Sequence, residues 1–377
     1  MTPCEGWEPA AFKARVDEVL QQYVAREADR FAAVDPLLAP VAVQLEAAVA
    51  HGKRLRAAFC YWGWRAVGQP DSDALVRAAA SMELVHAAAV THDDLIDDSP
   101  LRHGRPTAHV ALRTAVRGAP GHAGGGPGGR DGPGDCGGPG GPGASAVTDA
   151  AKSLAMLTGD LLMALAGDLF ATSGLPVAYL TRARPLWLLM ARELIAGECL
   201  EILRTGARPD VTQSLKVIRY KTAKYTVEQP LLIGGALAGA GPRLREGYSA
   251  YGLPLGEAFQ LRDDLLGLFG ATRDTGKANA DDLRGHRPTA LLAETWRLAG
   301  DDARELLDSY LGRSDLGGDD VDAVREVMRG LKAPDRIEDM ISARVGEALD
   351  TLHALDVPAL AATALTALAH SAAVRPS

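Results

Sequence analysis

Two clusters of aspartates in this sequence could bind a divalent cation. The first contains Asp93, Asp94 and Asp97, and the second contains Asp263 and Asp264. On a helix, Asp93 and Asp97 project from one face, where their like charges repel, and anions near a helix C-terminus oppose its dipole. A bound cation would relieve both effects. Oxygen-only ligands favour magnesium or calcium, and magnesium commonly combines one or two carboxylates with substrate phosphates.

Basic residues recur along the chain between and around these clusters. They are Lys53, Arg54, Arg56, Arg102, Lys221, Lys224, Lys277 and Arg287. Taken singly, each is most simply a solvated surface charge, and one acidic cluster alone could be a solvated helix end. Two aspartate pairs with several cations predict a site for two polyanions bridged by divalent metal.

Apolar residues recur at helical spacing through most of the chain. The predicted helices cover 11–34, 74–97, 150–173, 179–205, 211–240, 246–269, 286–311, 319–331 and 335–370. Both aspartate clusters therefore fall near the C-terminal ends of apolar helices. Hydrophobic residues make up 47% of the chain and aromatic residues only 5%, with abundant Ala and Leu, which lose least on entering a helix. The predicted fold class is all-α.

A glycine- and proline-rich stretch interrupts the helical pattern. Between Gly118 and Gly143 there is no large apolar residue, so the segment cannot bury enough surface to offset its ordering entropy. It also lacks the GK[ST] ending of a phosphate-binding loop. We predict a disordered insertion at 118–146 within a single domain spanning 1–377.

Charge and cysteine usage narrow the class of protein further. The net charge of −8 argues against a general nucleic-acid binder, which needs a basic face. The four cysteines are far apart and form no CxxC pair, so a disulfide framework or zinc site is not expected. The N-terminus does not resemble a signal peptide, and no apolar run predicts a membrane span. A cytoplasmic protein is the expectation.

Five motifs in order resemble those of the trans-isoprenyl diphosphate synthases, between about residues 35 and 300. They are GKRLR (52–56), HDDLIDDSPLRHGRPTAH (92–109), GD (159–160), KTAKYTVEQP (221–230) and GEAFQLRDDLLGLFG with TGK (256–277). The resemblance implies an antiparallel helical bundle around a deep central cavity, usually in a homodimer. It also implies Mg²⁺ as cofactor and isopentenyl diphosphate and an allylic diphosphate as substrates.

The resemblance also assigns roles to individual residues. Magnesium ligands would be Asp93, Asp94, Asp97, Asp263 and Asp264. The allylic diphosphate would be held by Arg102, Lys221, Thr222, Gln260 and Lys277, with Arg287 at a position where the family usually has lysine. Isopentenyl diphosphate would be held by Lys53, Arg56, His86 and His103. The residues expected to act in catalysis are Asp93, Asp94, Asp97, Arg102, Lys221 and Asp263.

Four positions depart from the family pattern. His103 stands where a second arginine is usual, Gly267 where a third aspartate is usual, Arg287 where lysine is usual and Glu198 where glutamine is common. Because of these departures, the alternative that the chain is a non-catalytic partner subunit of such an enzyme stays open. A class I terpene cyclase shares the DDxxD-type motif, but it would carry an NSE-type second motif in place of Asp263 and Asp264.

Two small residues lie one helical turn before Asp93. Ala88 and Ala89 would leave room for a growing chain, whereas a bulky aromatic there stops growth early in the family. The predicted main product is geranylgeranyl diphosphate. Farnesyl diphosphate or a longer chain is the alternative.

Overall fold

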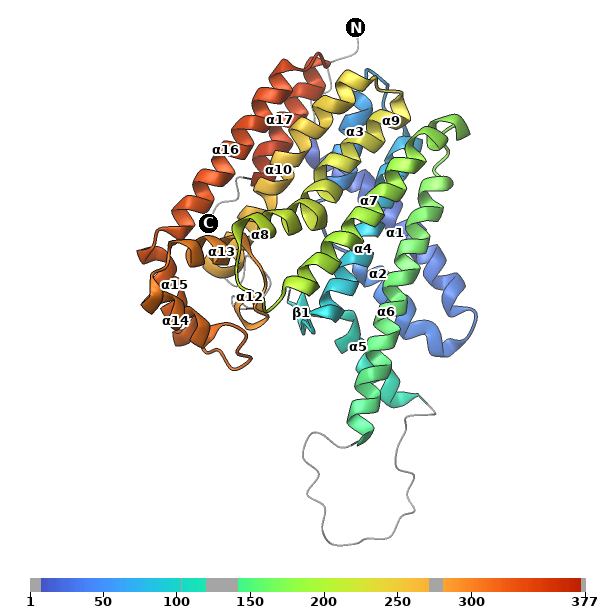
Figure 1. Ribbon diagram of the computed structural model, residues 1–377. Coiled ribbons are helices and arrows are strands. Elements are labelled where there is room, and N and C mark those ends of the chain that lie inside the picture. The colour runs from blue at the N-terminus through green and yellow to red at the C-terminus, as the bar shows by residue number, and fades with distance from the viewer. Residues whose placement is uncertain (1–7, 103, 120–141, 271–280, 374–377) are drawn as a thin grey trace, which may run out of the picture. The chain divides into compact units, whose positions relative to one another are not determined.

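Helices account for almost all regular structure in the computed structural model of the protein (Figure 1). The structure describes residues 8–102, 104–119, 142–270 and 281–373. The strands within these residues form a short hairpin, in which β1 (Leu101–Arg102) pairs antiparallel with β2 (Arg105–Pro106). The predicted all-α fold class is confirmed.

The chain folds into two compact units. The larger contains Met1–Lys13, Arg54–Ala79 and Ser173–Ser377, and the smaller contains Ala14–Lys53 and Ala80–Thr172. Two long helices, α1 (Pro9–Ala32) and α4 (Asp73–Ile96), each contribute residues to both units. The single domain expected from the sequence stays a prediction.

The larger unit packs its helices around buried aromatic side chains. Its elements are α3 (Leu55–Arg65), α7 (Val177–Arg204), α8 (Val211–Ile218), the π-helix η2 (Arg219–Glu228), α9 (Gln229–Ala238), α10 (Pro242–Phe269), α12 (Asp281–Arg284), α13 (Ala290–Leu298), α14 (Asp301–Tyr310), α15 (Gly318–Gly330), α16 (Ala333–Ala354) and α17 (Ala359–Ala373). Long helices α10 and α16 lie side by side, and η2 contacts both α7 and α10 (Figure 1). Phe59, Trp62, Tyr248 and Tyr251 are fully buried. The Tyr248 hydroxyl donates to the carbonyl of Gly63 over 2.7 Å, so its burial leaves no orphaned donor.

Glycines allow α3 and α9 to approach each other closely. A Cβ at Gly63 would lie 2.3 Å from the Leu231 carbonyl oxygen, and a Cβ at Gly234 would lie 1.9 Å from that of Cys60. Both distances are far inside van der Waals contact, and the obstructing atoms belong to backbone. The two helices therefore pack backbone against backbone at this point, which any larger residue would prevent.

The smaller unit has its own apolar cluster. Its further elements are η1 (Pro36–Leu38), α2 (Ala39–Val49), α5 (Ala108–Gly118) and α6 (Pro142–Ala171). Leu112, Val147 and Ala151 belong to the cluster between α5 and α6. The Tyr23 hydroxyl donates to an Asp168 carboxylate oxygen over 2.6 Å and joins α1 to α6. Thus α6, which follows the glycine-rich stretch, packs within the same unit as α5, which precedes it.

Several helix boundaries differ from the predicted ones. The single helix expected over 211–240 is divided into α8, η2 and α9. The helix expected over 335–370 is interrupted between α16 and α17 just before Pro358, because proline disfavours the helical conformation of the preceding residue. Helix α6 begins at Pro142, inside the stretch predicted to lack structure.

Two helices are long and apolar enough to cross a membrane, by length and composition alone. They are α4 and the Ala144–Ala171 part of α6. Core helices of globular proteins meet the same criterion, and 72% of the most apolar window of α4 is buried inside the protein. This is weak evidence, and neither helix is a clear membrane span.

Candidate active site

The first aspartate motif occupies the C-terminal end of α4 and is bonded to Arg102. Nε of Arg102 donates to Oδ1 of Asp94 over 2.7 Å, and Nη2 donates to Oδ2 of Asp93 over 3.1 Å. Burial alone would lower the pKa of Arg102, but the charges of Asp94, Asp93 and Asp97 raise it above its ordinary value. Arg102 therefore stays cationic and offsets part of the charge of the motif. The β1–β2 hairpin places it there, because it turns the chain back directly after α4.

The second aspartate motif lies in α10 and is joined to η2 by a chain of hydrogen bonds. Thr222 donates its hydroxyl to Oε1 of Gln260 over 2.8 Å, and Nε2 of Gln260 donates to Oδ1 of Asp264 over 2.9 Å. The backbone N–H of Ala290 donates to Oδ2 of Asp264 over 3.2 Å. Three residues assigned from the sequence are thus brought into contact.

The Asp264 carboxyl is only 7% exposed. Burial raises its pKa to about 8, the charges of Asp282 and Asp263 add to the rise, and the bonds from Gln260 and Ala290 oppose it. A nearby cation would favour the ionised form. Taken separately, each motif offers the carboxylate oxygens that suit magnesium: Asp93, Asp94 and Asp97 in the smaller unit, and Asp263 and Asp264 in the larger.

Asp282, at the start of α12, adds a carboxylate that the sequence reasoning did not single out. A Cβ at Gly267 would lie 3.3 Å from Oδ2 of Asp282, so this acid occupies space beside the position where the family usually has a third aspartate. Nη1 of Arg287 donates to Oδ1 of Asp282 over 3.0 Å. Arg287 is thereby placed near the second motif. The sequence offered no signal for Asp282, because the residue follows the motif by eighteen positions in a segment without regular spacing.

Lys221 is held by two glutamates of α7. Its Nζ lies 2.7 Å from Oε1 of Glu201 and 2.9 Å from Oε2 of Glu198. One turn further along η2, Nζ of Lys224 lies 2.9 Å from Oε1 of Glu193. Each lysine therefore has its direction fixed by carboxylates of α7. Glu198 was noted as a departure from the family pattern, whereas the role of Glu201 was missed, although its spacing of three from Glu198 places both on one helix face.

Glycines of the flanking helices admit the wide π-helical turn of η2. A Cβ at Gly197 in α7 would lie 2.2 Å from the Lys221 backbone nitrogen, and a Cβ at Gly256 in α10 would lie 2.5 Å from Cα of Ala223. The backbone that carries Lys221 and Thr222 is therefore in direct contact with both neighbours. π-Helical turns are rare and are frequent at functional sites.

Arg56 is bonded to η2 rather than exposed to solvent. Its guanidinium is 4.3 Å from the centre of the Tyr225 ring, and its Nη2 donates to the Tyr225 hydroxyl over 2.6 Å and to Oγ1 of Thr226 over 3.0 Å. With 6% exposure, this arginine contributes to the packing of α3 on η2. Its assignment to an isopentenyl diphosphate pocket stays a prediction.

The remaining predicted residues of the smaller unit lie along α4 and before α3. His86 is partly buried, Ala88 is fully buried and Ala89 is partly buried, while Lys53 is exposed. His86 and Asp93 are seven residues apart in α4 and so lie on roughly the same face. His103 and Lys277 lie outside the described residues.

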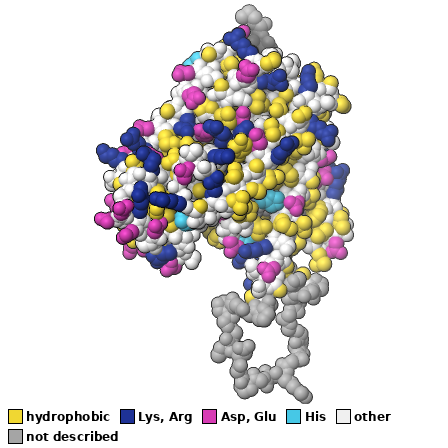
Figure 2. All heavy atoms as spheres, in the orientation of Figure 1, with side chains coloured by type: hydrophobic (Ala, Val, Ile, Leu, Met, Phe, Trp, Pro, Cys, Tyr) yellow, Lys and Arg dark blue, Asp and Glu magenta, His cyan; other side chains and the backbone are white. Residues whose placement is uncertain are grey.

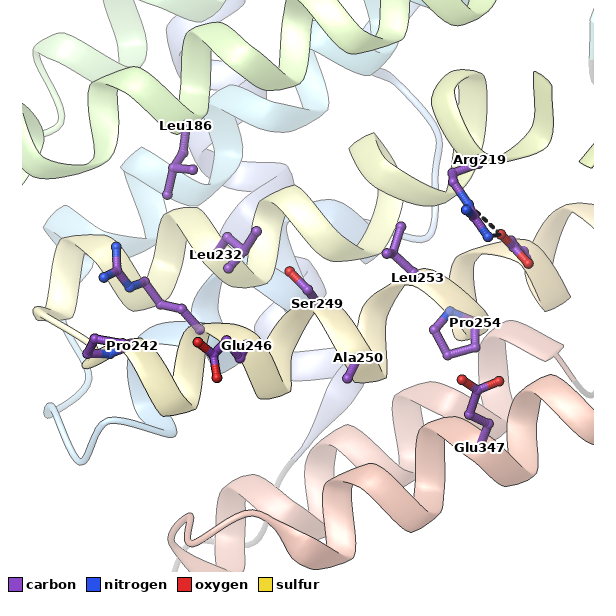
Figure 3. Close-up of a pocket in the computed structure, with 12 residues that line it drawn as sticks. Leu186, Arg219, Leu232, Pro242, Glu246, Ser249, Ala250, Leu253, Pro254 and Glu347 are labelled. Atoms are coloured by element: carbon purple, nitrogen blue, oxygen red, sulfur yellow. Dashed lines mark hydrogen bonds and ion pairs between the residues drawn. The ribbon is translucent and has the colours of Figure 1, made fainter. Parts of the chain in front are cut away.

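A groove of about 700 Å³ in the larger unit contains none of the predicted site residues (Figure 3). Leu232 from α9 and Leu253 and Pro254 from α10 form its apolar wall. Its charged edge is held together by Glu257, which pairs with Arg219 at 2.7 Å and accepts a hydrogen bond from Nε of a second arginine, Arg344 of α16, over 2.8 Å. Glu257 and the two arginines thus neutralise one another, and no aspartate of either motif lines the groove. The groove therefore differs from the aspartate motifs in both position and chemistry.

Comparison with known proteins finds one family description that covers most of the chain. The model of the polyprenyl synthetase family matches residues 41–119 and 140–328. A geranylgeranyl diphosphate synthase of Saccharolobus solfataricus is 27% identical over 284 residues, which cover 74% of this chain and 73% of that protein. A (2E,6E)-farnesyl diphosphate synthase of Mycobacterium tuberculosis is 30% identical over 285 residues, which cover 74% of this chain and 67% of that protein.

A solved structure shares the fold over nearly the whole chain. It is the geranylgeranyl pyrophosphate synthase of Corynebacterium glutamicum in complex with isoprenyl diphosphate and magnesium, with a TM-score of 0.87 and 29% identity. The match covers 98% of this chain and 100% of the other. The two curated relatives make products of different length, so similarity to them does not fix a product.

Proposed function

Because the chain belongs to the polyprenyl synthetase family, we propose that it is a magnesium-dependent prenyltransferase that joins isopentenyl diphosphate to an allylic diphosphate. The observation that carries the proposal is the chemistry of its two aspartate motifs. One is bonded to Arg102, and the other is bonded to Thr222 through Gln260. Each combines carboxylates that suit a divalent cation with a cation or hydroxyl that suits a phosphate oxygen.

The proposed reaction begins when the bond between the allylic carbon and its diphosphate oxygen breaks, so that pyrophosphate leaves with the electron pair and an allylic cation remains. Magnesium, when bound, supplies positive charge against the leaving phosphates. Asp93 and Asp97 would hold magnesium at the first motif and Asp263 would hold an ion at the second, and Arg102 and Lys221 would bind the diphosphate and stabilise the charge that develops on it. The double bond of isopentenyl diphosphate then attacks the allylic cation, and a proton leaves to the released pyrophosphate.

The second substrate is proposed to bind to basic residues at the start of α3 and in the second half of α4. Lys53, His86 and Arg56 are the candidates within the described residues, and His103 is a further candidate beyond them. Lys277 is proposed to join the contacts to the allylic diphosphate.

The proposed main product is geranylgeranyl diphosphate, with farnesyl diphosphate or a longer chain as the alternative. Ala88 and Ala89 support growth past farnesyl, because side chains of this size, one helical turn before Asp93 in α4, would not block a growing chain.

A homodimer is proposed from the outward face of α7. Leu188, Ile195 and Ile202 are spaced by seven residues and are 49%, 57% and 47% exposed. Figure 2 shows hydrophobic side chains over this helix. An apolar stripe of this kind is typical of a surface that another helix covers.

The function is tested by incubating the protein with Mg²⁺, isopentenyl diphosphate and each of the dimethylallyl, geranyl and farnesyl diphosphates. Lengthened diphosphates, found by mass spectrometry and lost when the metal is chelated, are expected. Cyclised or hydrolysed starter would indicate a terpene cyclase. Binding of both diphosphates without any conversion would indicate a non-catalytic partner subunit.

A further inference from the structure

The Gly159-Asp160 motif on α6 contacts the histidine that directly precedes the first aspartate motif. Nε2 of His92 lies 3.2 Å from the carbonyl oxygen of Met156 and 3.4 Å from Oδ1 of Asp160. A carbonyl oxygen can only accept, so Nε2 carries the hydrogen in this contact. His92 belongs to α4, and all these residues lie in the smaller unit. The contact therefore joins the end of α4 to the middle of α6.

The ring of His92 occupies the space that a side chain at position 159 would fill. A Cβ built on Gly159 would lie 2.3 Å from Nε2, 2.5 Å from Cδ2 and 2.8 Å from Cε1 of His92. Real Cβ atoms essentially never approach other atoms so closely. The His92 ring can therefore lie here only because residue 159 is glycine. We call the space beside Gly159 that the ring occupies the His92 notch.

The end of α4 needs such a contact more than most helix ends do. Asp93 and Asp94 follow His92 directly, and Asp97 lies one turn later, so like charges gather where the helix dipole already disfavours anions. These repulsions favour fraying of the last turn, and Arg102 offsets only part of them. A ring fixed in a notch of α6 immediately before the first ligand restrains the rotation and the position of that turn.

We propose that His92 is a positioning residue for the first aspartate motif. Its ring, seated in the Gly159 notch, holds the last turn of α4 so that Asp93 and Asp97 present their carboxylates to magnesium diphosphate. This inference rests on the proposed function, because it concerns the same site. The inference also gives the Gly159-Asp160 motif a role, which is to hold the His92 ring without itself contacting substrate.

Four variants test the notch: Gly159→Ala, His92→Ala, the double variant of these two, and His92→Gln. Gly346→Ala on α16 is the control, because a Cβ there meets no atom within 4 Å. Calorimetry measures binding of inorganic pyrophosphate in the presence of Mg²⁺, and thermal unfolding without ligand measures the fold. Neither readout depends on turnover.

Gly159→Ala should weaken pyrophosphate binding by roughly tenfold, as loss of an outer partner of metal ligands typically does. Its unliganded melting temperature should fall only slightly, because the atoms that must move are the end of one side chain. The double variant should bind no more weakly than His92→Ala, since each single change already removes the ring from the notch, one by filling its space and the other by deleting it. His92→Gln should keep most of the affinity, because its amide N–H can reach the same carbonyl.

Either of two results would overturn the inference. One is wild-type pyrophosphate affinity in Gly159→Ala, and the other is a double variant whose loss equals the sum of the single losses. Failure of the proposed function is recognised separately. In that case the wild-type protein would lengthen no starter, whatever the binding measurements on the variants show.

Discussion

Replacing Asp264 with Asn should stabilise the ligand-free protein and weaken its response to magnesium pyrophosphate. The carboxyl is 7% exposed, and burial raises its pKa to about 8. An Asn side chain has nearly the same shape and is neutral at every pH. It can keep both hydrogen bonds: its oxygen accepts from the Ala290 N–H, and its NH₂ donates to the Gln260 amide once that amide has turned over. The substitution therefore removes the charge and leaves the packing in place.

The size of the effect follows from the pKa of Asp264 in the folded and unfolded states. The folded value of about 8 lies above the unfolded value near 4, so the stability contributed by this group is complete below pH 4 and is lost as the pH rises towards 8. One pKa unit corresponds to about 1.4 kcal/mol. Between pH 6 and 8 the wild-type protein should lose roughly 2–3 kcal/mol of its free energy of unfolding through this group. The Asn variant should lose none through it, and at pH 7 its gain has an upper bound of about 4 kcal/mol.

Urea denaturation at pH 6, 7 and 8 without divalent metal measures this difference. The gap between Asp264→Asn and the wild type should widen with pH, and Asp302→Asn, on the exposed face of α14, should follow the wild type. Adding Mg²⁺ with inorganic pyrophosphate should raise the stability of the wild type, most of all at pH 8, and should raise that of Asp264→Asn by less, because one carboxylate near the metal is lost while the others remain. If the variant is less stable than the wild type at all three pH values, the carboxyl is held charged by the fold and the reasoning is refuted.

Two further substitutions test the product and the assembly. Ala89→Phe should shorten the main product by at least one isoprene unit, as measured by chromatography of the dephosphorylated products. We choose Ala89 because Ala88 is fully buried, so that Ala88→Phe would fold less readily. An unchanged product would mean that the chain does not pass this residue. Ile195→Glu should reduce the mass in light scattering from dimer to monomer, whereas Leu306→Glu, which changes a 40% exposed leucine on α14, should not. A monomeric wild type, or a variant that remains dimeric, would exclude the α7 face as the interface.

The fold class and most long helices could be predicted because they follow from apolar periodicity alone. The expected 74–97, 179–205 and 319–331 helices correspond to α4, α7 and α15 within two residues at each end. Shorter helices such as α2, α3 and α5 were not identified, since eleven residues offer few repeats of a 3.6-residue period. The π-helix was missed for a related reason: the apolar residues of 211–240 suit a helix, and the extra residue per turn leaves no separate signal.

The site could be predicted in its charges but not in its contacts. The carboxylates and cations were identified because their spacing and their resemblance to a family single them out. That Arg102 bonds Asp94, or that Thr222 reaches Asp264 through Gln260, depends on how separate helices meet. Asp282 and the His92 notch depend on glycines that let other groups come close. An absent side chain reveals nothing in the sequence about which neighbour occupies its space.

The π-helical form of η2 ties the length of this segment to the orientation of the helix that follows it. A π-helical turn closes its hydrogen bonds over one more residue than an α-helical turn does. Every later side chain therefore points in a different direction around the helix axis than it would in a continuous α-helix. Helix α9 continues directly from η2, and Gly234 must face the backbone of Cys60. A relative that lost one residue from 219–228 would therefore turn a different side chain towards α3, where no Cβ fits. Insertions and deletions in this part of the protein should accordingly be selected against even where they leave Lys221 and Thr222 intact.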